Sequence, residues 1–492
     1  MTVPPEQAET ARFLSQLAGG PPRETHISAV FIGADTVWKL KKAVRMPFLD
    51  FTTVAARHHF LRRELALNQP HAPGIYRDVA AVGRRPDGSL ALTAEDEAAV
   101  DWVLRMAPVP EQDFLDVIAA AGGLTLALQD ALGDCVARYH APLPPVTDWD
   151  SAAALRRITR GNVQSALAAR LPEAEVRRWQ QGMESAIMAR AAWLAGRAGG
   201  GFVRRCHGDL HLGNLCLWQG VPVAFDALEF DEAMATIDVG YDLAFLLMDL
   251  DHRVGRAAAN RVMNRYVART GDAGLTAGLP VFLSQRAMVR AHVLAAMERG
   301  EEAQVYLQAA SAYLSPPPAR VLAIGGLQGT GKSTIARAIA PDFGPAPGAL
   351  VLRSDELRKR LHGVAPEAKL PPEAYSQSAN AAVNHALIDL ARTGAAGGHG
   401  VIVDATFLDR AMRHDLGAAI RAESIPFTGV WLQAPLAVLE RRIAARQGDA
   451  SDATVAVLRQ AVAADPGAGD WRAVDARDGA QAVRDIRAAV AG

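Results

Sequence analysis

Cysteine, long apolar runs and net charge are all scarce in this sequence. Its 492 residues include three cysteines, an odd number that argues against a disulfide framework and favours a reducing compartment. No run of about 18 apolar residues occurs, and the N-terminal MTVPPEQAET lacks the basic and apolar regions of a signal peptide. The net charge is −1, so no overall positive field attracts nucleic acid or an anionic membrane. We therefore expect a cytoplasmic protein with neither a membrane nor a nucleic-acid partner, and the oligomeric state stays open.

The residues that are present are typical of a globular chain with more than one domain. Half of them are hydrophobic and 21% are charged. β-Branched and aromatic runs that turn at residues 33–35 and 86–88 predict two hairpins, and DWVLRM predicts a further strand. The helix expected between the hairpins has an apolar stripe of Phe60, Leu61, Leu65 and Leu67. Three prolines in residues 315–320 predict an extended linker, after which alternating strand and helix signals indicate an α/β domain.

A glycine-rich segment after the linker carries the strongest motif. Residues 326–333, GLQGTGKS, fit G-x-x-x-x-G-K-[ST], follow a predicted strand and open a predicted helix. In that context backbone N–H groups face phosphate oxygens, Lys332 reaches the β- and γ-phosphates, and Ser333 ligates Mg²⁺. The sequence therefore predicts an ATP–Mg²⁺ site, with Lys332 as a catalytic residue, made by Gly326, Gln328, Gly329, Thr330, Gly331, Lys332, Ser333 and Thr334.

Charged residues further along the chain could complete the predicted ATP–Mg²⁺ site. Asp404, at the end of the predicted strand GVIVD, is a candidate partner of the hydrated Mg²⁺, or alternatively caps the next helix. Asp355 could accept the proton of a substrate hydroxyl, and Arg358, one turn later, could hold an anionic substrate or the γ-phosphate. Their alternative is a basic helix with an N-cap aspartate. Arg442 and Arg446 share one face of a helix and could be lid arginines that contact the nucleotide, or simply solvated charges.

Taken together, VLRSDELRKRL, VIVDATF and RRIAAR resemble the P-loop kinases of the gluconate kinase, polynucleotide kinase and zeta-toxin type. The resemblance covers roughly residues 320 to 492 and implies phosphoryl transfer from ATP. It does not name the acceptor. A polynucleotide 5′-end is allowed by the basic run at residues 358–360, but the near-neutral charge and the lack of an aromatic stacking series argue against it.

The segment CHGDLHLGN, residues 206–214, predicts a second kind of site. His207 and His211 could share a metal ion, but glycines at 208 and 213 interrupt the helix such a pair would need. Phosphoryl transfer accounts for more of the segment: Asp209 accepts the hydroxyl proton, and Asn214 binds Mg²⁺. Asp226, after the next predicted strand, supplies a further oxygen for the metal.

These residues are similar to the H-G-D-x-x-x-x-N loop and metal-binding aspartate of the aminoglycoside phosphotransferase family, which has a protein-kinase-like fold. The resemblance covers roughly residues 25 to 310. It implies a nucleotide-facing lysine, for which Lys39 is favoured over Lys41, and a helix glutamate paired with it, Glu64. It also implies an adenine-binding hinge near Met106.

Two departures from that family pattern are visible. Only Gly33 precedes the lysine, so the phosphates cannot be covered by a protein-kinase-like glycine-rich loop. The metal aspartate sits in Phe-Asp-Ala rather than Asp-Phe-Gly, which makes a protein-kinase-type activation switch doubtful. We interpret Asp242 as a support for the catalytic loop, with a solvent-exposed helix position as the alternative. Arg286 and Arg290, four apart on a predicted helix, could bind an anionic substrate or form salt bridges.

The order of the modules resembles a bacterial family in which a kinase-like phosphotransferase is fused to a P-loop ATP-binding kinase. We expect two modules that use ATP and Mg²⁺ to phosphorylate hydroxyls of small-molecule acceptors. In the alternative, one module catalyses and the other is a nucleotide-binding switch. The expected fold class is α+β followed by α/β, with a kinase-like domain at 1–314 (small lobe about 20–106, large lobe about 107–314), a linker at 315–320 and a P-loop domain at 321–492.

Overall fold

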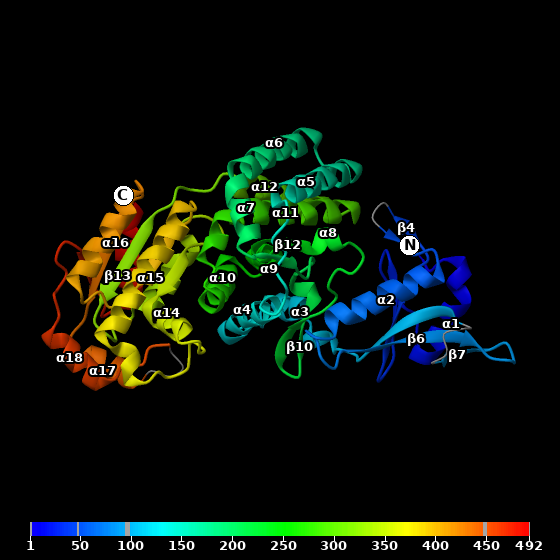
Figure 1. Cartoon of the computed structure of the whole chain (residues 1–492), viewed down its shortest axis with the longest axis horizontal. Coiled ribbons are helices and arrows are strands. Elements are labelled where there is room, and N and C mark those ends of the chain that lie inside the picture. The colour runs from blue at the N-terminus through cyan, green and yellow to red at the C-terminus, as the bar shows by residue number, and fades with distance from the viewer. Residues whose placement is uncertain (1, 47–48, 94–98, 446–449, 492) are drawn as a thin grey trace. The chain divides into compact units, whose positions relative to one another are not determined.

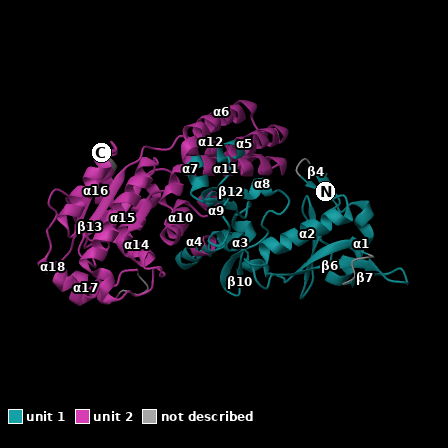
Figure 2. Cartoon of the chain, in the orientation of Figure 1, with its two compact units in different colours: residues 1–131, 138–154, 194–246 teal, residues 132–137, 155–193, 247–492 magenta. Residues whose placement is uncertain are grey.

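The computed structural model describes residues 2–46, 49–93, 99–445 and 450–491 (Figure 1). These residues form two compact units. Unit 1 comprises residues 1–131, 138–154 and 194–246, and unit 2 comprises residues 132–137, 155–193 and 247–492 (Figure 2). Unit 2 therefore includes helices that precede the proline-rich segment as well as everything that follows it.

An antiparallel sheet of six strands dominates the first part of unit 1. Both predicted hairpins are present, and the order of the strands is β1-β2-β3-β8-β6-β7. The elements of this region are α1 (Ala8–Ala18), β1 (Arg23–Glu24), β2 (Ser28–Ile32), β3 (Val37–Lys41), β4 (Arg45–Met46), β5 (Leu49–Asp50), α2 (Val54–Asn68), β6 (Tyr76–Arg84), β7 (Leu90–Thr93) and β8 (Ala99–Met106), with a short 3₁₀ helix at Pro5–Gln7.

Helix α2 packs on this sheet through a stripe that differs from the predicted one. Its fully buried residues are Arg57, Leu61, Glu64 and Asn68, three of which are polar. Each polar side chain is paired: Arg57 binds Asp101, Glu64 binds two lysines, and Asn68 accepts a hydrogen bond from a backbone N–H at 2.9 Å. The apolar pattern predicted the helix but not its buried face. A polar side chain can be buried when it forms a hydrogen bond or an ion pair, and such partners are not visible in the apolar pattern.

Mostly helical sequence follows, interrupted by the short strands on either side of residues 206–214. In unit 1 β9 pairs with β12 and β10 pairs with β11. The elements are α3 (Leu115–Ala120), α4 (Leu126–His140), α5 (Ser151–Ala168), α6 (Glu173–Ala189), α7 (Ala191–Gly199), β9 (Val203–Arg205), β10 (Leu215–Trp218), β11 (Val221–Ala224), α8 (Glu232–Ala235), β12 (Thr236–Asp238), α9 (Val239–Arg253), α10 (Arg256–Thr270), α11 (Leu279–Ala296) and α12 (Gly300–Tyr313), with 3₁₀ helices at Glu111–Asp113, Leu212–Asn214 and Ala273–Gly278.

A five-stranded parallel sheet forms the C-terminal part of unit 2, in the order β14-β15-β13-β16-β17. Every residue of β13, β14 and β15 is buried, as expected for a sheet covered on both faces. Helix α13 packs against α19, and α15 packs against α16. The elements are β13 (Val321–Gly326), α13 (Lys332–Ile339), β14 (Leu350–Arg353), α14 (Ser354–Leu361), α15 (Gln377–Ala396), β15 (Val401–Asp404), α16 (Arg410–Ala422), β16 (Phe427–Gln433), α17 (Leu436–Ala444), α18 (Val455–Ala463), β17 (Arg472–Asp475) and α19 (Gly479–Ala491), with 3₁₀ helices at Ala340–Asp342 and Pro372–Tyr375.

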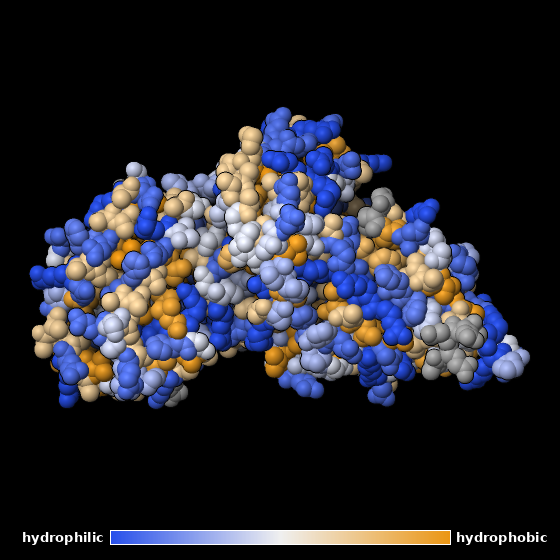
Figure 3. Space-filling model, in the orientation of Figure 1, coloured by the Kyte–Doolittle hydropathy of each residue, from blue (hydrophilic) through white to orange (hydrophobic). Residues whose placement is uncertain are grey.

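The predicted fold class is confirmed, because a mixed α+β region precedes a parallel α/β sheet. Among the described residues, no helix has both the length and the apolar character needed to span a bilayer. On the face drawn in Figure 3, hydrophobic residues lie in small groups among hydrophilic ones.

Candidate active sites

The first site is built on the loop that joins β9 to β10 in unit 1. Asp242, fully buried near the start of α9, accepts hydrogen bonds from the backbone N–H groups of His207 at 3.1 Å and Gly208 at 2.9 Å. Gly208 has φ +85°, and a Cβ there would lie 3.1 Å from the Cβ of Leu228. The aspartate thus fixes a loop that only glycine can turn at this point.

His207 supports this loop, because both of its ring nitrogens contact backbone groups. Its Nε2 lies 2.9 Å from the carbonyl oxygen of Phe225, and its Nδ1 accepts from the N–H of Asp209 at 3.3 Å. Burial lowers the pKa of His207, which favours the neutral ring that this pattern needs. Because both nitrogens face backbone groups, the alternative in which His207 shares a metal ion with His211 is disfavoured.

Asp209 and Asn214 face each other across the loop. The Nδ2 of Asn214 donates to both the carboxylate and the carbonyl oxygen of Asp209, each at 2.9 Å. This use of the nitrogen leaves the amide oxygen as the group suited to a hard cation. His211 lies with its Nε2 3.6 Å from the Asp209 carboxylate, too far for a hydrogen bond.

Asp226 stands two residues after β11 in a left-handed backbone conformation, φ 62°. Such a conformation is rare for a residue with a side chain and concentrates at functional positions. The hydroxyl oxygen of Tyr76 accepts from the Asp226 N–H at 2.9 Å and helps to hold it there. The Asp226 carboxylate lies 2.6 Å from Lys39 Nζ, which also contacts Glu64 at 2.7 Å.

The two candidate lysines of β3 have different partners. Lys39 bridges Glu64 and the predicted metal ligand Asp226, whereas Lys41 is fully buried and binds Glu64 at 2.8 Å and Glu229. Burial opposes both charges, but the neighbouring carboxylates raise the pKa of each lysine, that of Lys39 well above its ordinary value. The contacts thus distinguish Lys39, which meets the predicted metal ligand, from Lys41, which meets two glutamates.

The side chains of this unit offer one further cluster of metal-ligating type. Among the described residues, only His140, Cys206 and Asp242 bring three such groups within reach of one ion, and all three are buried. Asp242 already accepts from His140 at 3.0 Å and from the two loop N–H groups. We interpret the cluster as internal support for the loop.

The second site lies in unit 2, where β13 runs into α13. The loop requires glycine because a Cβ at Gly326 would lie 2.6 Å from the carbonyl oxygen of Leu432, and one at Gly329 would lie 2.8 Å from that of Leu439. Both glycines have positive φ. Lys332 begins α13 and folds back, so that its Nζ lies 2.9 Å from the carbonyl oxygen of Gly326. The backbone therefore has the form of a phosphate-binding loop.

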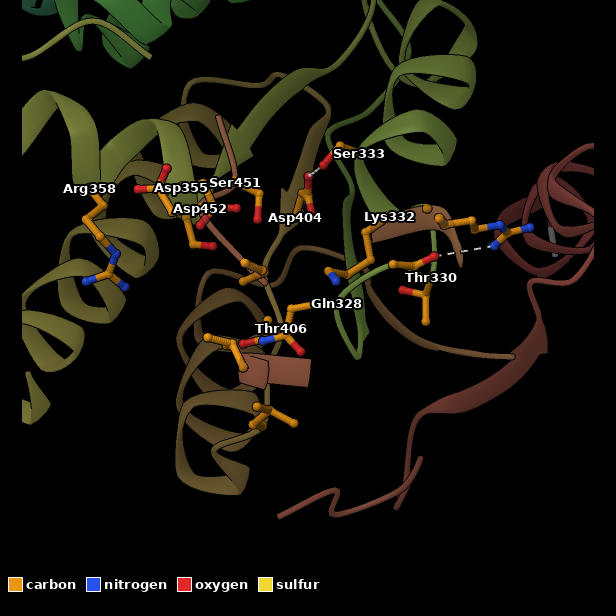
Figure 4. Close-up of a pocket in the computed structure, with 18 of the residues that line it drawn as sticks. Gln328, Thr330, Lys332, Ser333, Asp355, Arg358, Asp404, Thr406, Ser451 and Asp452 are labelled. Atoms are coloured by element: carbon orange, nitrogen blue, oxygen red, sulfur yellow. Dashed lines mark hydrogen bonds between the residues drawn. The ribbon is translucent and has the colours of Figure 1, made fainter. Parts of the chain in front are cut away.

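Ser333 and Asp404 meet beside this loop, as Figure 4 shows. The Ser333 hydroxyl donates to the Asp404 carboxylate at 2.5 Å, and Arg353 Nε lies 3.2 Å from the same oxygen. Arg353 also binds Glu356 at 2.6 Å. A hydroxyl and a carboxylate at a phosphate-binding loop are the groups that hold Mg²⁺ and its water shell.

A cavity of about 960 Å³ opens over the loop and is lined by the predicted residues Asp355 and Arg358. Burial raises the pKa of Asp355, although Arg353 and Lys332 oppose this. Arg358 donates to the carbonyl oxygen of Ala374 at 2.7 Å and to Asn380 at 2.8 Å. Its guanidinium is therefore largely engaged in holding the cavity wall.

Asp452 closes one side of this cavity. Its carboxylate accepts from Lys359, from the hydroxyl of Tyr375 at 2.5 Å and from the N–H of Leu370 at 3.2 Å. The predicted lid residue Arg446 lies outside the described residues. Arg442, on α17, donates to the carbonyl oxygens of Ala476 and Arg477 at 2.9 Å each.

Three other predicted residues, Met106, Arg286 and Arg290, stand on β8 and α11. Met106 ends β8, half-buried and paired in register with Val37 and Tyr76. Arg286 is buried on α11 and Arg290 is half-buried one turn later, both in the unit that does not contain Asp209.

Sequence reasoning missed several residues of the sites. The missed residues are paired, buried or half-buried polar groups: Asn68, Tyr76, Glu229, Arg353 and Asp452. Glu229 carried one signal, since an acidic residue in the otherwise apolar ALEF calls for a buried cation.

Residues 321–464 match the family model of an AAA domain. The C-terminal part is an AAA-type P-loop domain. An uncharacterized protein of Mycobacterium tuberculosis (strain ATCC 25618 / H37Rv) is 29% identical to this chain over 454 residues. The match covers 88% of each protein. The match therefore extends well beyond residues 321–464.

The chain is also similar to two solved phosphotransferase structures over parts of its length. A gluconokinase from Sinorhizobium meliloti 1021 is 22% identical with a TM-score of 0.26, and the match covers 35% of this chain and 92% of that one. Wild-type aminoglycoside 2'-phosphotransferase-IIIa is 14% identical with a TM-score of 0.37, and the match covers 63% of this chain and 99% of that one.

Proposed function

We propose that the chain is a cytoplasmic, ATP- and Mg²⁺-dependent phosphotransferase with two sites, each of which phosphorylates a hydroxyl of a small-molecule acceptor. The kinase-like module occupies residues 1–314 and the P-loop module residues 321–492. One observation carries the proposal. Unit 1 and unit 2 each contain, by themselves, a lysine, oxygen ligands for a cation and a further carboxylate.

The side chains of the first site fit a nucleotide bound with Mg²⁺. Asn214 and Asp226 present the amide and carboxylate oxygens that this hard cation prefers, and Lys39 bears the positive charge for the phosphates. When bound, ATP–Mg²⁺ supplies the γ-phosphoryl group and neutralises charge that develops during its transfer. Asp209 accepts the proton of the acceptor hydroxyl, and Asn214 orients its carboxylate through the 2.9 Å hydrogen bond.

The second site fits the same cofactor with different parts. The P-loop N–H groups and Lys332 bind phosphate oxygens, and Ser333 and Asp404 hold the cation. Asp355 lines the same cavity, and in this proposal it is the group that accepts the proton of the acceptor hydroxyl. The raised pKa of this carboxyl brings it closer to neutral pH, where a general base works best.

The proposal is tested by incubating the protein and ATP–Mg²⁺ with a metabolite extract and identifying phosphorylated products by mass spectrometry. The wild type is compared with Asp209→Ala and Lys332→Ala. We expect each variant to lose a different subset of the products. Asp87→Ala and Lys369→Ala, at exposed positions in the same two units, should keep both subsets.

Other outcomes identify the alternatives. If one lesion removes all phosphotransfer and the other changes nothing, the second module is a nucleotide-binding switch and bifunctionality is wrong. If ATP raises the melting temperature of the wild type, and the substitution that leaves phosphotransfer unchanged abolishes this shift, the substituted module is the sensor. Products phosphorylated at polynucleotide 5′-ends would instead move the P-loop module to nucleic-acid repair chemistry.

A further inference from the structure

The free edge of the parallel sheet in unit 2 is covered by a helix that precedes the linker. Strand β14 is the terminal strand of the sheet, and within the described part of the chain it pairs only with β15. An edge strand presents unpaired N–H and C=O groups, which must find partners when they are buried. Helix α10 supplies those partners through two asparagines one turn apart, Asn260 and Asn264.

Asn264 takes the place of a neighbouring strand. Its Nδ2 donates to the carbonyl oxygen of Ala349 at 3.0 Å, and its Oδ1 accepts from the N–H of Val351 at 2.6 Å. Asn260 donates to the same carbonyl at 2.9 Å. The Asn264 amide is oriented by Asn260, because its Nδ2 also lies 3.0 Å from the carbonyl oxygen and 3.1 Å from the Oδ1 of that residue.

The C-terminal end of α10 contacts the next element of the P-loop domain. A Cβ at Gly271, which caps α10 with φ 77°, would lie 2.8 Å from the guanidinium of Arg360 on α14. Arg265 binds Glu367, in the loop after α14, at 2.6 Å. Helix α10 thus contacts the chain on both sides of Asp355, near β14 before it and near the end of α14 after it.

Asp355 lies at the junction of these two elements, as the second residue of α14 directly after β14 ends. We propose that α10 sets the position of Asp355 relative to the phosphate-binding loop, and that Asn264 is the positioning residue through which it acts. The inference rests on the proposed phosphotransfer at the P-loop. Lys332 and Ser333 stand on α13 rather than on β14 or α14, so we expect the nucleotide-binding loop to depend on these contacts less than Asp355 does.

The experiment compares Asn264→Ala with Asn260→Ala in the full-length chain. The two substitutions remove the same atoms from the same helix, and Asn260 is the more buried of the two. Asn260→Ala leaves the Ala349 carbonyl bonded to Asn264, whereas Asn264→Ala leaves the N–H of Val351 without its partner. Hydrogen exchange should therefore accelerate across residues 350–361 in Asn264→Ala, and much less in Asn260→Ala.

Steady-state kinetics of the same variants test whether Asn264 affects catalysis. We expect Asn264→Ala to lower kcat of the Lys332-dependent reaction by about tenfold to a hundredfold, because small displacements of a reacting group have effects of that size. The affinity for nucleotide at the P-loop and the Asp209-dependent reaction should change by less than about twofold. Asn264→Asp, which keeps the acceptor for Val351 but loses the donor, should lie between the wild type and Asn264→Ala.

The inference is overturned if exchange over residues 350–361 is unchanged, or if it rises equally in both alanine variants. It is also overturned if kcat and nucleotide affinity fall together. Absence of any Lys332-dependent turnover in the wild type would refute the proposed function of this site instead. Exchange over residues 350–361 would then still decide whether α10 holds the Asp355 junction.

Discussion

Replacing Lys41 by methionine tests the buried ion-pair network behind the first site. Lys41→Met keeps most of the apolar stem of the side chain and removes a charge that binds Glu64 and Glu229. Glu64 retains Lys39, but Glu229, 6% exposed, loses the ammonium group of Lys41. Loss of one partner from a buried pair costs about 3–5 kcal/mol, so we expect the free energy of unfolding to fall by about 3 kcal/mol.

A second substitution separates the network from simple loss of packing. Glu229→Gln in the Lys41→Met background removes the uncompensated charge, and neutral replacements of a whole buried pair are often tolerated. The double variant should therefore lie within about 1 kcal/mol of the wild type. If Glu229→Gln alone does not stabilise the protein, this corresponds to a coupling energy of about 2 kcal/mol or more. Lys42→Met is the matched control, since Lys42 is also fully buried but binds Glu24 instead.

Hydrogen exchange of β3 in urea measures these free energies for the sheet rather than for the whole chain. Two results would refute the reasoning. In the first, Lys41→Met costs less than about 1 kcal/mol, well below the range expected for a buried pair. In the second, the double variant is as unstable as the sum of the single ones. Coupling between Lys42→Met and Glu229→Gln of similar size would show that the effect is not specific to the pair.

Three further predictions concern pH, backbone and metal. Lys39 and Lys41 overcome the effect of burial and lower the pKa of Glu64 to about 2, so the stability that Glu64 contributes should be present above about pH 4.5 and lost as the pH falls towards 2; acid titration of wild type and Glu64→Gln should converge there. Gly208→Ala should cost about 1–2 kcal/mol and abolish Asp209-dependent turnover, because alanine is strained at φ +85°; normal turnover would contradict this. Asp404→Asn should raise the Mg²⁺ concentration for half-maximal P-loop turnover about tenfold or more, measured by metal titration, with Asp209-dependent turnover as the unchanged control.

Local patterns in the sequence predicted the parts of the sites that lie close together along the chain. The P-loop is such a part, because its glycines, lysine and serine occur within eight residues between a strand and a helix. The hairpin that carries Lys39 is also local. In each case the residues that determine the geometry are neighbours in the chain, so their spacing alone contains the information.

Partners that are distant in the chain could not be read in the same way. Lys39 and Lys41 point to the same side of β3, and only the positions of Asp226 and Glu229 distinguish them. The buried stripe of α2 is polar for the same reason, since Glu64 is buried against lysines of another element. Asn264 looks like an ordinary helix residue until the edge of β14 is placed beside it.

The central claim is that one chain binds nucleotide at two separate sites that each transfer phosphate. Calorimetric titration of the full-length protein with a non-hydrolysable ATP analogue and Mg²⁺ tests the binding half of the claim directly. The account predicts two equivalents per wild-type chain, and one each in Lys39→Met and Lys332→Ala, with the loss at a different site in each. A single equivalent in the wild type, or loss of all binding in either variant, would contradict it.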